Sequence, residues 1–95
     1  MSRITITKPD DWHIHLRDGD MLERTVNDVA AWANRAVVMP NLTPPVKNVS
    51  DATAYHSRIM AALAGSPQFE PLMTLYLTDS TTPDDIAAAA QSNLV

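Results

Sequence analysis

The 95-residue sequence contains no cysteine, which excludes a disulfide framework and a thiolate metal site. It has no basic run either: 7 Lys and Arg stand against 11 Asp and Glu, giving a formal net charge of -4. Nucleic acid and anionic membranes are bound by clustered positive charge, so we expect neither as a partner. No stretch approaches the roughly 18 apolar residues of a membrane span, and the first nine residues lack the apolar core of a secretion signal. These absences predict a soluble, cytoplasmic protein.

The composition is that of an ordinary globular protein, 45% hydrophobic and 19% charged, and one pattern occurs three times. Each time a short apolar run is followed by a polar turn and a segment with helical periodicity. Such alternation predicts an α/β fold of parallel βαβ units, with the second run buried on both faces of the sheet. We expect Asp20 to cap the first helix. The predicted strands are residues 11–16, 36–39 and 71–78, and the predicted helices are residues 21–33, 50–64 and 83–90.

The motif that carries chemistry is His13-Ile14-His15, at the end of the first apolar run. In a strand the side chains alternate, so both imidazoles would face one way and Trp12, Ile14 and Leu16 the other. Two strand residues span roughly 6.6 Å, from which two imidazoles can converge on one zinc ion at ~2.0–2.1 Å. Taken alone, such a pair is more often two partly exposed histidines. Its place at the carboxyl end of a strand in a barrel-type pattern, where active sites form, favours a metal site.

Two polar residues near this motif are candidate substrate ligands. Arg17 follows directly, and its guanidinium could hold a substrate carboxylate through two hydrogen bonds. Asn41 follows the second apolar run, and its amide could bond the same group from the same end of the sheet. The alternatives are a surface arginine in a turn and an Asx-turn residue in a proline-rich loop. We interpret Asp10 and Asp11 as solvated, and His56 as a solvent-facing helix residue.

Three segments of the chain resemble the opening of bacterial-type dihydroorotases, within the amidohydrolase superfamily. They are residues 9–22, 35–46 and 71–79, which follow the family's order and span nearly the whole chain. An H-x-H pair alone would indicate only an amidohydrolase. The string W-H-x-H-L-R-D-G-D-M-L at residues 12–22, with the loop M-P-N-L-x-P-P-V at residues 39–46, is specific to the dihydroorotase class.

This resemblance implies a (β/α)₈ TIM-type barrel with a binuclear zinc site at the carboxyl ends of its strands. His13 and His15 match two ligands of one metal, and Arg17 and Asn41 match the residues that bind the substrate carboxylate. The implied reaction is the zinc-dependent, reversible hydrolysis of the cyclic amide of dihydroorotate to N-carbamoyl-aspartate, in pyrimidine biosynthesis. Homodimers are known in the family. Its remaining ligands and its general acid/base come from later strands, so we expect no catalytic residue in this chain.

We expect residues 1–95 to be the N-terminal portion of a single barrel domain, about three βα units, because closing a barrel takes about 250 residues. Residues 93–95 are interpreted as the end of a helix and the onset of a fourth strand, before which the chain is truncated. The chain alone is then expected to be inactive. Two alternatives remain open: a non-catalytic truncated module that pairs with a partner chain, and a cyclic-amide hydrolase with another substrate, such as a hydantoin.

Overall fold

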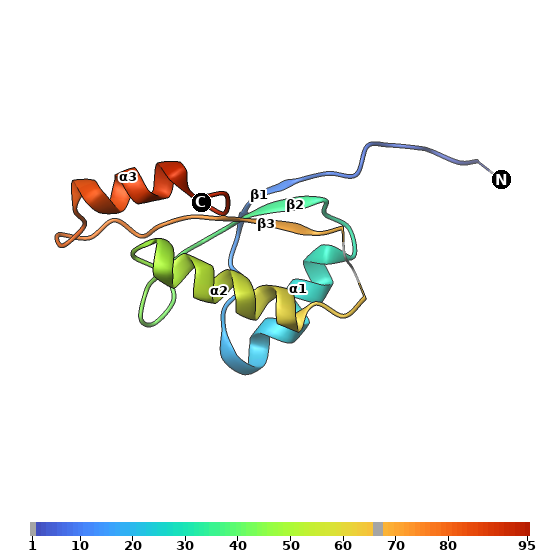
Figure 1. The fold of residues 1–95 in the computed structure, drawn as a ribbon. Helices are drawn as coiled ribbons and strands as arrows, with labels where there is room; N and C mark the ends of the chain where they lie inside the picture. Colours follow the sequence, from blue (N-terminus) through green and yellow to red (C-terminus); the bar gives the residue numbers. More distant parts are fainter. Residues whose placement is uncertain (1, 66–67) are drawn as a thin grey trace.

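The computed structural model describes residues 2–65 and 68–95, in which three parallel strands form one sheet of order β1-β2-β3. Helices α1 and α2 cover one face of this sheet, and the strands run toward the end of the molecule where α3 lies (Figure 1). The predicted α/β class, three parallel βα units in sequence, is confirmed. The elements are β1 (Asp11–Ile14), the 3-10 turn η1 (Gly19–Met21), α1 (Leu22–Ala30), β2 (Arg35–Val38), α2 (Val49–Ala62), β3 (Glu70–Met73) and α3 (Pro83–Gln91).

The core lies between the sheet and these two helices. Helix α1 turns Leu22, Val26 and Val29 inward, at the three- and four-residue spacing expected of an amphipathic helix. Strand β2 alternates between buried and half-buried residues, so only Ala36 and Val38 are fully enclosed. The prediction that this strand is buried on both faces is therefore wrong for the chain as described, because α1 and α2 cover one face only. Within residues 2–65 and 68–95, no helix combines the length and apolarity that crossing a membrane requires.

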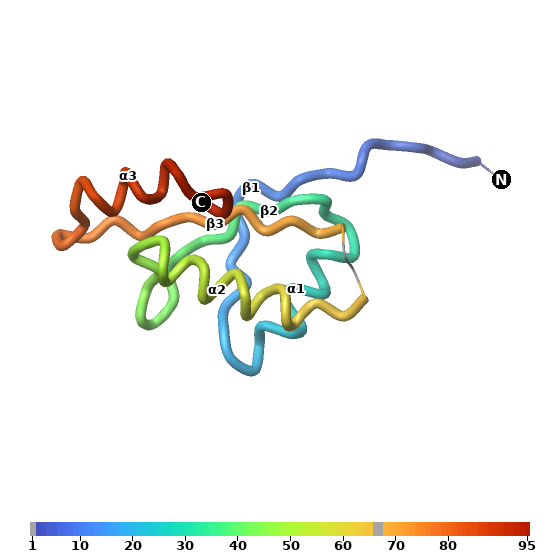
Figure 2. The backbone as a smooth tube through the Cα atoms, viewed as in Figure 1, coloured from blue at the N-terminus to red at the C-terminus, as the bar shows by residue number. Residues whose placement is uncertain are grey.

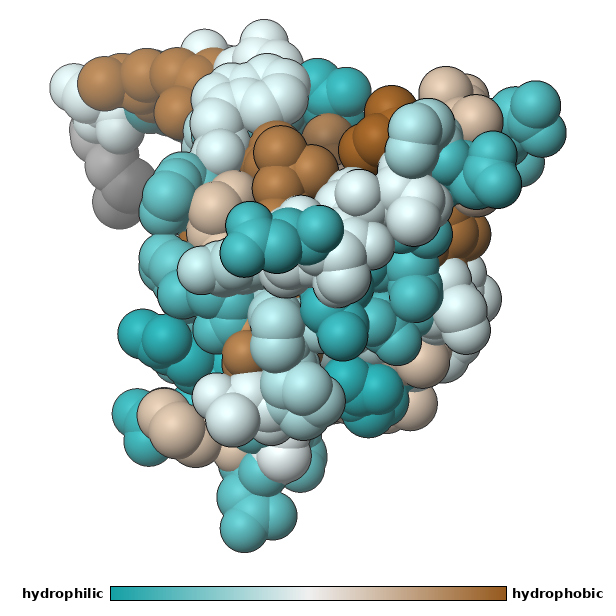
Figure 3. All heavy atoms as spheres, turned by 90° about the vertical axis from the view of Figure 1, so that its left-hand side faces the viewer, coloured by the Kyte–Doolittle hydropathy of each residue, from teal (hydrophilic) through white to brown (hydrophobic). Residues whose placement is uncertain are grey.

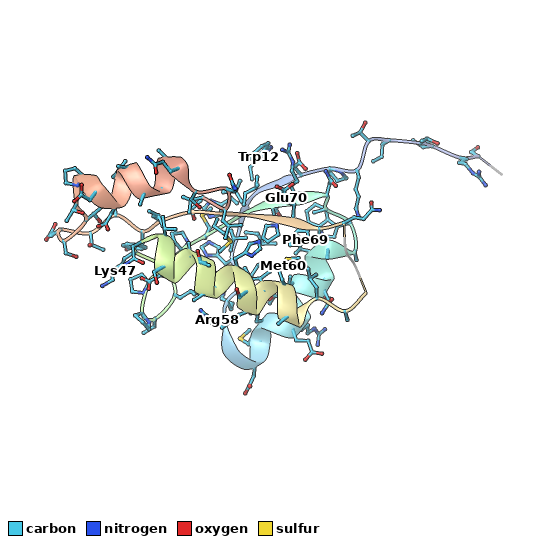
Figure 4. The ribbon with its side chains drawn as sticks, in the orientation of Figure 1. Trp12, Lys47, Arg58, Met60, Phe69 and Glu70 are labelled. Carbon is cyan, nitrogen blue, oxygen red and sulfur yellow. The ribbon has the colours of Figure 1, made fainter. Side chains whose placement is uncertain are left out.

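A bulge in β1 decides which side chains reach the open face of the sheet, opposite α1 and α2. Asp11 pairs with Ala36 and Ile14 with Val38, so Trp12 and His13 together stand opposite the single residue between those partners. Trp12 consequently lies on the open face, 64% exposed, instead of sharing the helix-covered side with Ile14 and Leu16 as predicted (Figure 4). The extra residue leaves His13 on the open face as well.

The element ends differ from the predicted ones where side chains or loops offer better hydrogen bonds. Strand β3 ends at Met73, because the Tyr76 N–H bonds Val46 O in the proline-rich loop at 2.7 Å. Asp20 lies inside the 3-10 turn and does not cap α1. Helix α3 begins as predicted, with Thr82 and Asp85 forming a capping box before and after Pro83.

The backbone beyond α3 returns to the sheet (Figure 2). The Met73 N–H donates to Leu94 O at 2.8 Å, so the residues that follow the third helix meet the outer edge of β3. This is the edge at which a further parallel strand would pair.

Asp10 is held in an ion pair, which corrects its interpretation as a solvated residue. The Arg35 guanidinium donates to both carboxylate oxygens of Asp10, at 3.2 and 2.6 Å, and the Asp10 side chain is only 20% exposed. The same guanidinium lies 5.7 Å from the centre of the Trp12 ring, on the open face. The hydrogen bond from Arg35 lowers the pKa of Asp10 below its ordinary value of 3.8 and outweighs the opposing effect of burial.

We expect Asp10→Asn to lower the free energy of unfolding at neutral pH but not in acid. Because the pKa of Asp10 is depressed in the folded state, its stabilising contribution is present above pH 3.8 and is lost as the pH falls through the folded-state pKa. Urea unfolding at a series of pH values measures this. Asp28→Asn, which removes an exposed pair with Arg24 at 3.7 Å, is the control and should change little. A difference between Asp10→Asn and the parent that does not shrink as the pH is lowered through the acid range would contradict the assignment.

Candidate metal and substrate site

An open hollow of about 610 Å³ lies at the carboxyl ends of the strands and is lined by His13, His15 and Asn41. This end faces the viewer in Figure 3, where apolar surface gathers in the upper half and polar surface dominates below. The remaining lining residues come from the segments that follow β2 and β3, namely Met39, Pro40, Leu75, Tyr76 and Leu77. The carboxyl edge of the sheet therefore brings the two histidines and the asparagine together from separate βα units.

The two imidazole rings face each other through the same nitrogen. Nε2 of His13 lies 3.1 Å from Nε2 of His15, and the rings are inclined at 66° with their centres 5.0 Å apart. Two nitrogens bound to one tetrahedral zinc at ~2.0–2.1 Å stand roughly 3.3–3.4 Å apart. The observed distance between the two Nε2 atoms is close to that value, so the binding of one zinc ion between them would require little movement of either ring.

Asn41 determines which ring nitrogen of neutral His15 carries the proton. Its Oδ1 lies 2.9 Å from His15 Nδ1, and an amide oxygen can only accept a hydrogen bond. The ring proton of neutral His15 therefore sits on Nδ1, and Nε2 presents its lone pair toward His13. Histidines that bind metals commonly donate their second ring N–H in this manner, which fixes both tautomer and ring orientation. The Asn41 amide nitrogen is the part of the side chain left for a substrate.

The donor set fits zinc but does not complete its coordination. Neutral imidazoles are usual zinc ligands, and His13 and His15 present two of them to one point. Across the part of the chain that the structure describes, no three His, Asp or Glu side chains come together as a metal site. Since zinc takes four ligands, two imidazoles leave two positions for groups from outside these residues or for water.

Arg17 does not line the hollow. It follows His15 by two residues, its side chain is exposed, and its backbone has a left-handed φ of 62°. The structure thus brings three of the four predicted site residues together and places the fourth just beyond them, on the turn that leaves β1. That Arg17 and Asn41 bind the same substrate carboxylate stays a prediction.

Several residues near the site were not among the predicted ligands. Tyr76 lines the hollow from beyond the end of β3 and is 45% exposed, whereas Thr78 lines a separate small hollow next to α3. Tyr55 and Arg58 of α2 contact the turn that carries Arg17. Only tertiary packing reveals these contacts, since 38 and 40 residues of sequence separate the partners.

Parallel strands in chain order, with polar side chains gathered at their carboxyl ends, fit a segment of a (β/α)₈-type barrel. Two solved structures match this fold. A dihydroorotase from Campylobacter jejuni superposes with a TM-score of 0.80 and 39% identity, covering 90% of this chain and 25% of that one. A dihydroorotase from Saccharomyces cerevisiae in complex with 5-fluoroorotic acid gives 0.78 and 32%, covering 87% of this chain and 22% of that one.

Curated relatives carry the same name at higher identity. The chain is 57% identical over all 95 residues to a dihydroorotase of Rhizobium leguminosarum and 58% identical over 95 residues to one of Coxiella burnetii. It spans 28% and 27% of the length of these two proteins. No family model matches the chain. Along its whole length the chain is thus similar in sequence to dihydroorotases, and its fold matches the N-terminal part of the dihydroorotase barrel.

Proposed function

We propose that this chain supplies the first three βα units of a cytoplasmic, zinc-dependent dihydroorotase. The reaction is the reversible hydrolysis of the cyclic amide of dihydroorotate to N-carbamoyl-aspartate, in pyrimidine biosynthesis. Identity of 56–59% to proteins of that name over 93 to 95 residues supports the reaction class. The lack of cysteine fits a reducing compartment.

One observation carries the proposal: His15 stands between His13 and Asn41, with a nitrogen 3.1 Å from the first and 2.9 Å from the second. At 3.1 Å the two Nε2 atoms are within hydrogen-bond distance of each other, and the same convergence brings both nitrogens within reach of one ion. The bond from Asn41 makes His15 Nε2 a lone-pair donor, which is the state that a metal requires.

The roles that we assign to the residues follow from their chemistry. His13 and His15 hold one zinc ion. Arg17 pairs with the substrate carboxylate through its planar guanidinium, and the Asn41 amide nitrogen donates to the same group. When bound, zinc polarises a carbonyl as a Lewis acid and lowers the pKa of water. The walls formed by Leu75 and Leu77 present apolar surface to the substrate ring.

The test is an assay of the protein purified at its native length, whose mass is first measured by intact mass spectrometry. We expect zinc in the purified protein, and turnover of dihydroorotate and N-carbamoyl-aspartate in both directions. Hydantoin serves as the control cyclic amide, because it lacks the carboxylate for which Arg17 and Asn41 are proposed. Turnover of hydantoin in preference to dihydroorotate would identify the other cyclic-amide hydrolase. A zinc-free protein that turns over neither compound would favour the partner-dependent, non-catalytic module.

A further inference from the structure

The backbone of Arg17 adopts a conformation that an arginine rarely takes. Its φ is 62°, and Gly19 two residues later also has a φ of 62°. Among the residues that the structure describes, Arg17 is the one non-glycine residue with a positive φ. Side chains disfavour this region, so the surrounding contacts must enforce it. The backbone conformation of the turn that carries Arg17 therefore depends on the residues that contact this turn.

Helix α2 holds this turn at two points. The Tyr55 hydroxyl donates to the backbone oxygen of Arg17, and the Tyr55 side chain is completely buried. One turn of helix later, Arg58 donates from Nε and Nη2 to the two carboxylate oxygens of Asp18, at 3.0 and 2.9 Å. Arg58 lies on the side of α2 away from the sheet, toward the segment that leads into α1 (Figure 4).

These two contacts reinforce each other. The Arg58 guanidinium also lies 5.2 Å from the centre of the Tyr55 ring, within the range of a cation–π interaction. Burial, with the nearby charge of Asp18, raises the pKa of Tyr55 to about 12, so its hydroxyl keeps the proton that it donates. Burial tends to raise the pKa of Asp18, but hydrogen bonds from Arg58 and Gly19 outweigh it and lower that pKa below 3.8. Near neutral pH the hydroxyl is thus a donor and the carboxylate an acceptor.

On the other side of the same turn, Thr25 of α1 donates to the backbone oxygen of Leu16 at 2.5 Å. Leu16, Arg17 and Asp18 are thus each hydrogen-bonded to α1 or α2, while the Arg17 side chain itself stays exposed. A long, flexible side chain loses less conformational freedom on binding a partner when its backbone is already fixed.

We propose that Tyr55 and Arg58 form a clamp that positions Arg17 for the substrate carboxylate, so that α2 contributes to substrate binding without touching the substrate. This inference rests on the proposed function, since the role of Arg17 as a carboxylate ligand belongs to that proposal. Tyr55 and Arg58 are positioning residues: they act on KM through Arg17 and leave the chemistry at the histidines unchanged.

Two measurements on the protein at its native length test the clamp. Trypsin cleaves after arginine, so the rate of cutting between Arg17 and Asp18 reports how firmly the turn is held, independently of activity. Tyr55→Phe keeps the buried ring and removes only the hydroxyl, and it should raise both this rate and KM about fivefold, the ratio that one typical hydrogen bond corresponds to. Arg58→Ala should act in the same direction, and Arg58→Lys should restore part of the effect. kcat and zinc content should stay within about twofold of the parent in all three variants.

The matched control is Arg24→Ala, because Arg24 forms an exposed pair with Asp28 through one contact of 3.7 Å, and its side chain is 88% exposed. It should change neither the cleavage after Arg17 nor KM. Unchanged cleavage in Tyr55→Phe and Arg58→Ala would overturn the clamp itself. Faster cleavage with an unchanged KM, in an enzyme that turns over dihydroorotate, would overturn its role in substrate binding. A parent protein without such turnover would overturn the proposed function, and this role of the clamp with it.

Discussion

Alanine in place of His15 is expected to reduce bound zinc and to lower kcat for dihydroorotate hydrolysis by a factor of roughly 10³ or more. The substitution removes one of the two nitrogens that converge at 3.1 Å, and it leaves Asn41 Oδ1 without its donor. Losing an outer partner of a metal ligand typically costs about 10- to 100-fold in affinity or activity, so losing the ligand itself should cost more. Metal content after dialysis, measured by elemental analysis, and steady-state kinetics give the two readouts.

The chain offers its own control for this experiment. His56 is the third histidine, half-buried on α2 and absent from the residues that line the hollow. His56→Ala should retain both zinc and kcat, whereas His13→Ala should behave like His15→Ala. A His15→Ala protein that keeps its full zinc content and its turnover would refute the assignment of this pair as metal ligands.

The alternation of strands and helices could be predicted from the sequence because it depends on local periodicity. Apolar residues spaced three and four apart mark α1, and Pro83 with the acidic residues that follow it marks the start of α3. Such signals need no knowledge of the rest of the fold. The parallel arrangement of the strands follows from this alternation, because a connection that contains a helix is long enough to cross over and return the chain to the start of a parallel strand.

The departures from prediction share a physical origin in contacts between distant segments. The strand expected to reach residue 78 ends at Met73, because the following backbone bonds Val46 in the proline-rich loop. Asp10 forms an ion pair with Arg35, which is 25 residues away. The bulge that turns Trp12 to the open face arises from the pairing of β1 with β2 and leaves no mark in the residue pattern of β1 alone.

The candidate site divides in the same way. The pairing of His13 with His15 could be predicted, since two residues two positions apart at a strand end are neighbours wherever the strand lies. The hydrogen bond between His15 and Asn41 could not be predicted, because the sequence places Asn41 near the same sheet edge but gives neither its distance from His15 nor the direction of its side chain. A substrate role or an Asx turn was predicted for Asn41, whereas the structure shows that its side-chain oxygen lies 2.9 Å from Nδ1 of His15, a proposed metal ligand.

Methionine in place of Arg17 is expected to raise KM for dihydroorotate roughly 10- to 100-fold, which corresponds to the loss of hydrogen bonds between charged partners. Methionine keeps most of the length and apolar stem of the side chain and removes the guanidinium. Because Arg17 lies outside the hollow that His13 and His15 line, zinc content should be unchanged. Arg24→Met, on the exposed surface of α1, controls for the loss of one positive charge.

A double-substitution cycle then separates the role of Arg17 from that of the clamp. If Tyr55 acts on substrate binding only through Arg17, adding Tyr55→Phe to Arg17→Met should raise KM no further, although each change alone raises it. Additive increases would mean that Tyr55 affects binding by another route. An unchanged KM in Arg17→Met itself would remove Arg17 from the substrate site. In that case the left-handed turn and its contacts to α2 would be a device for folding the first βα unit, with no part in recognising the carboxylate.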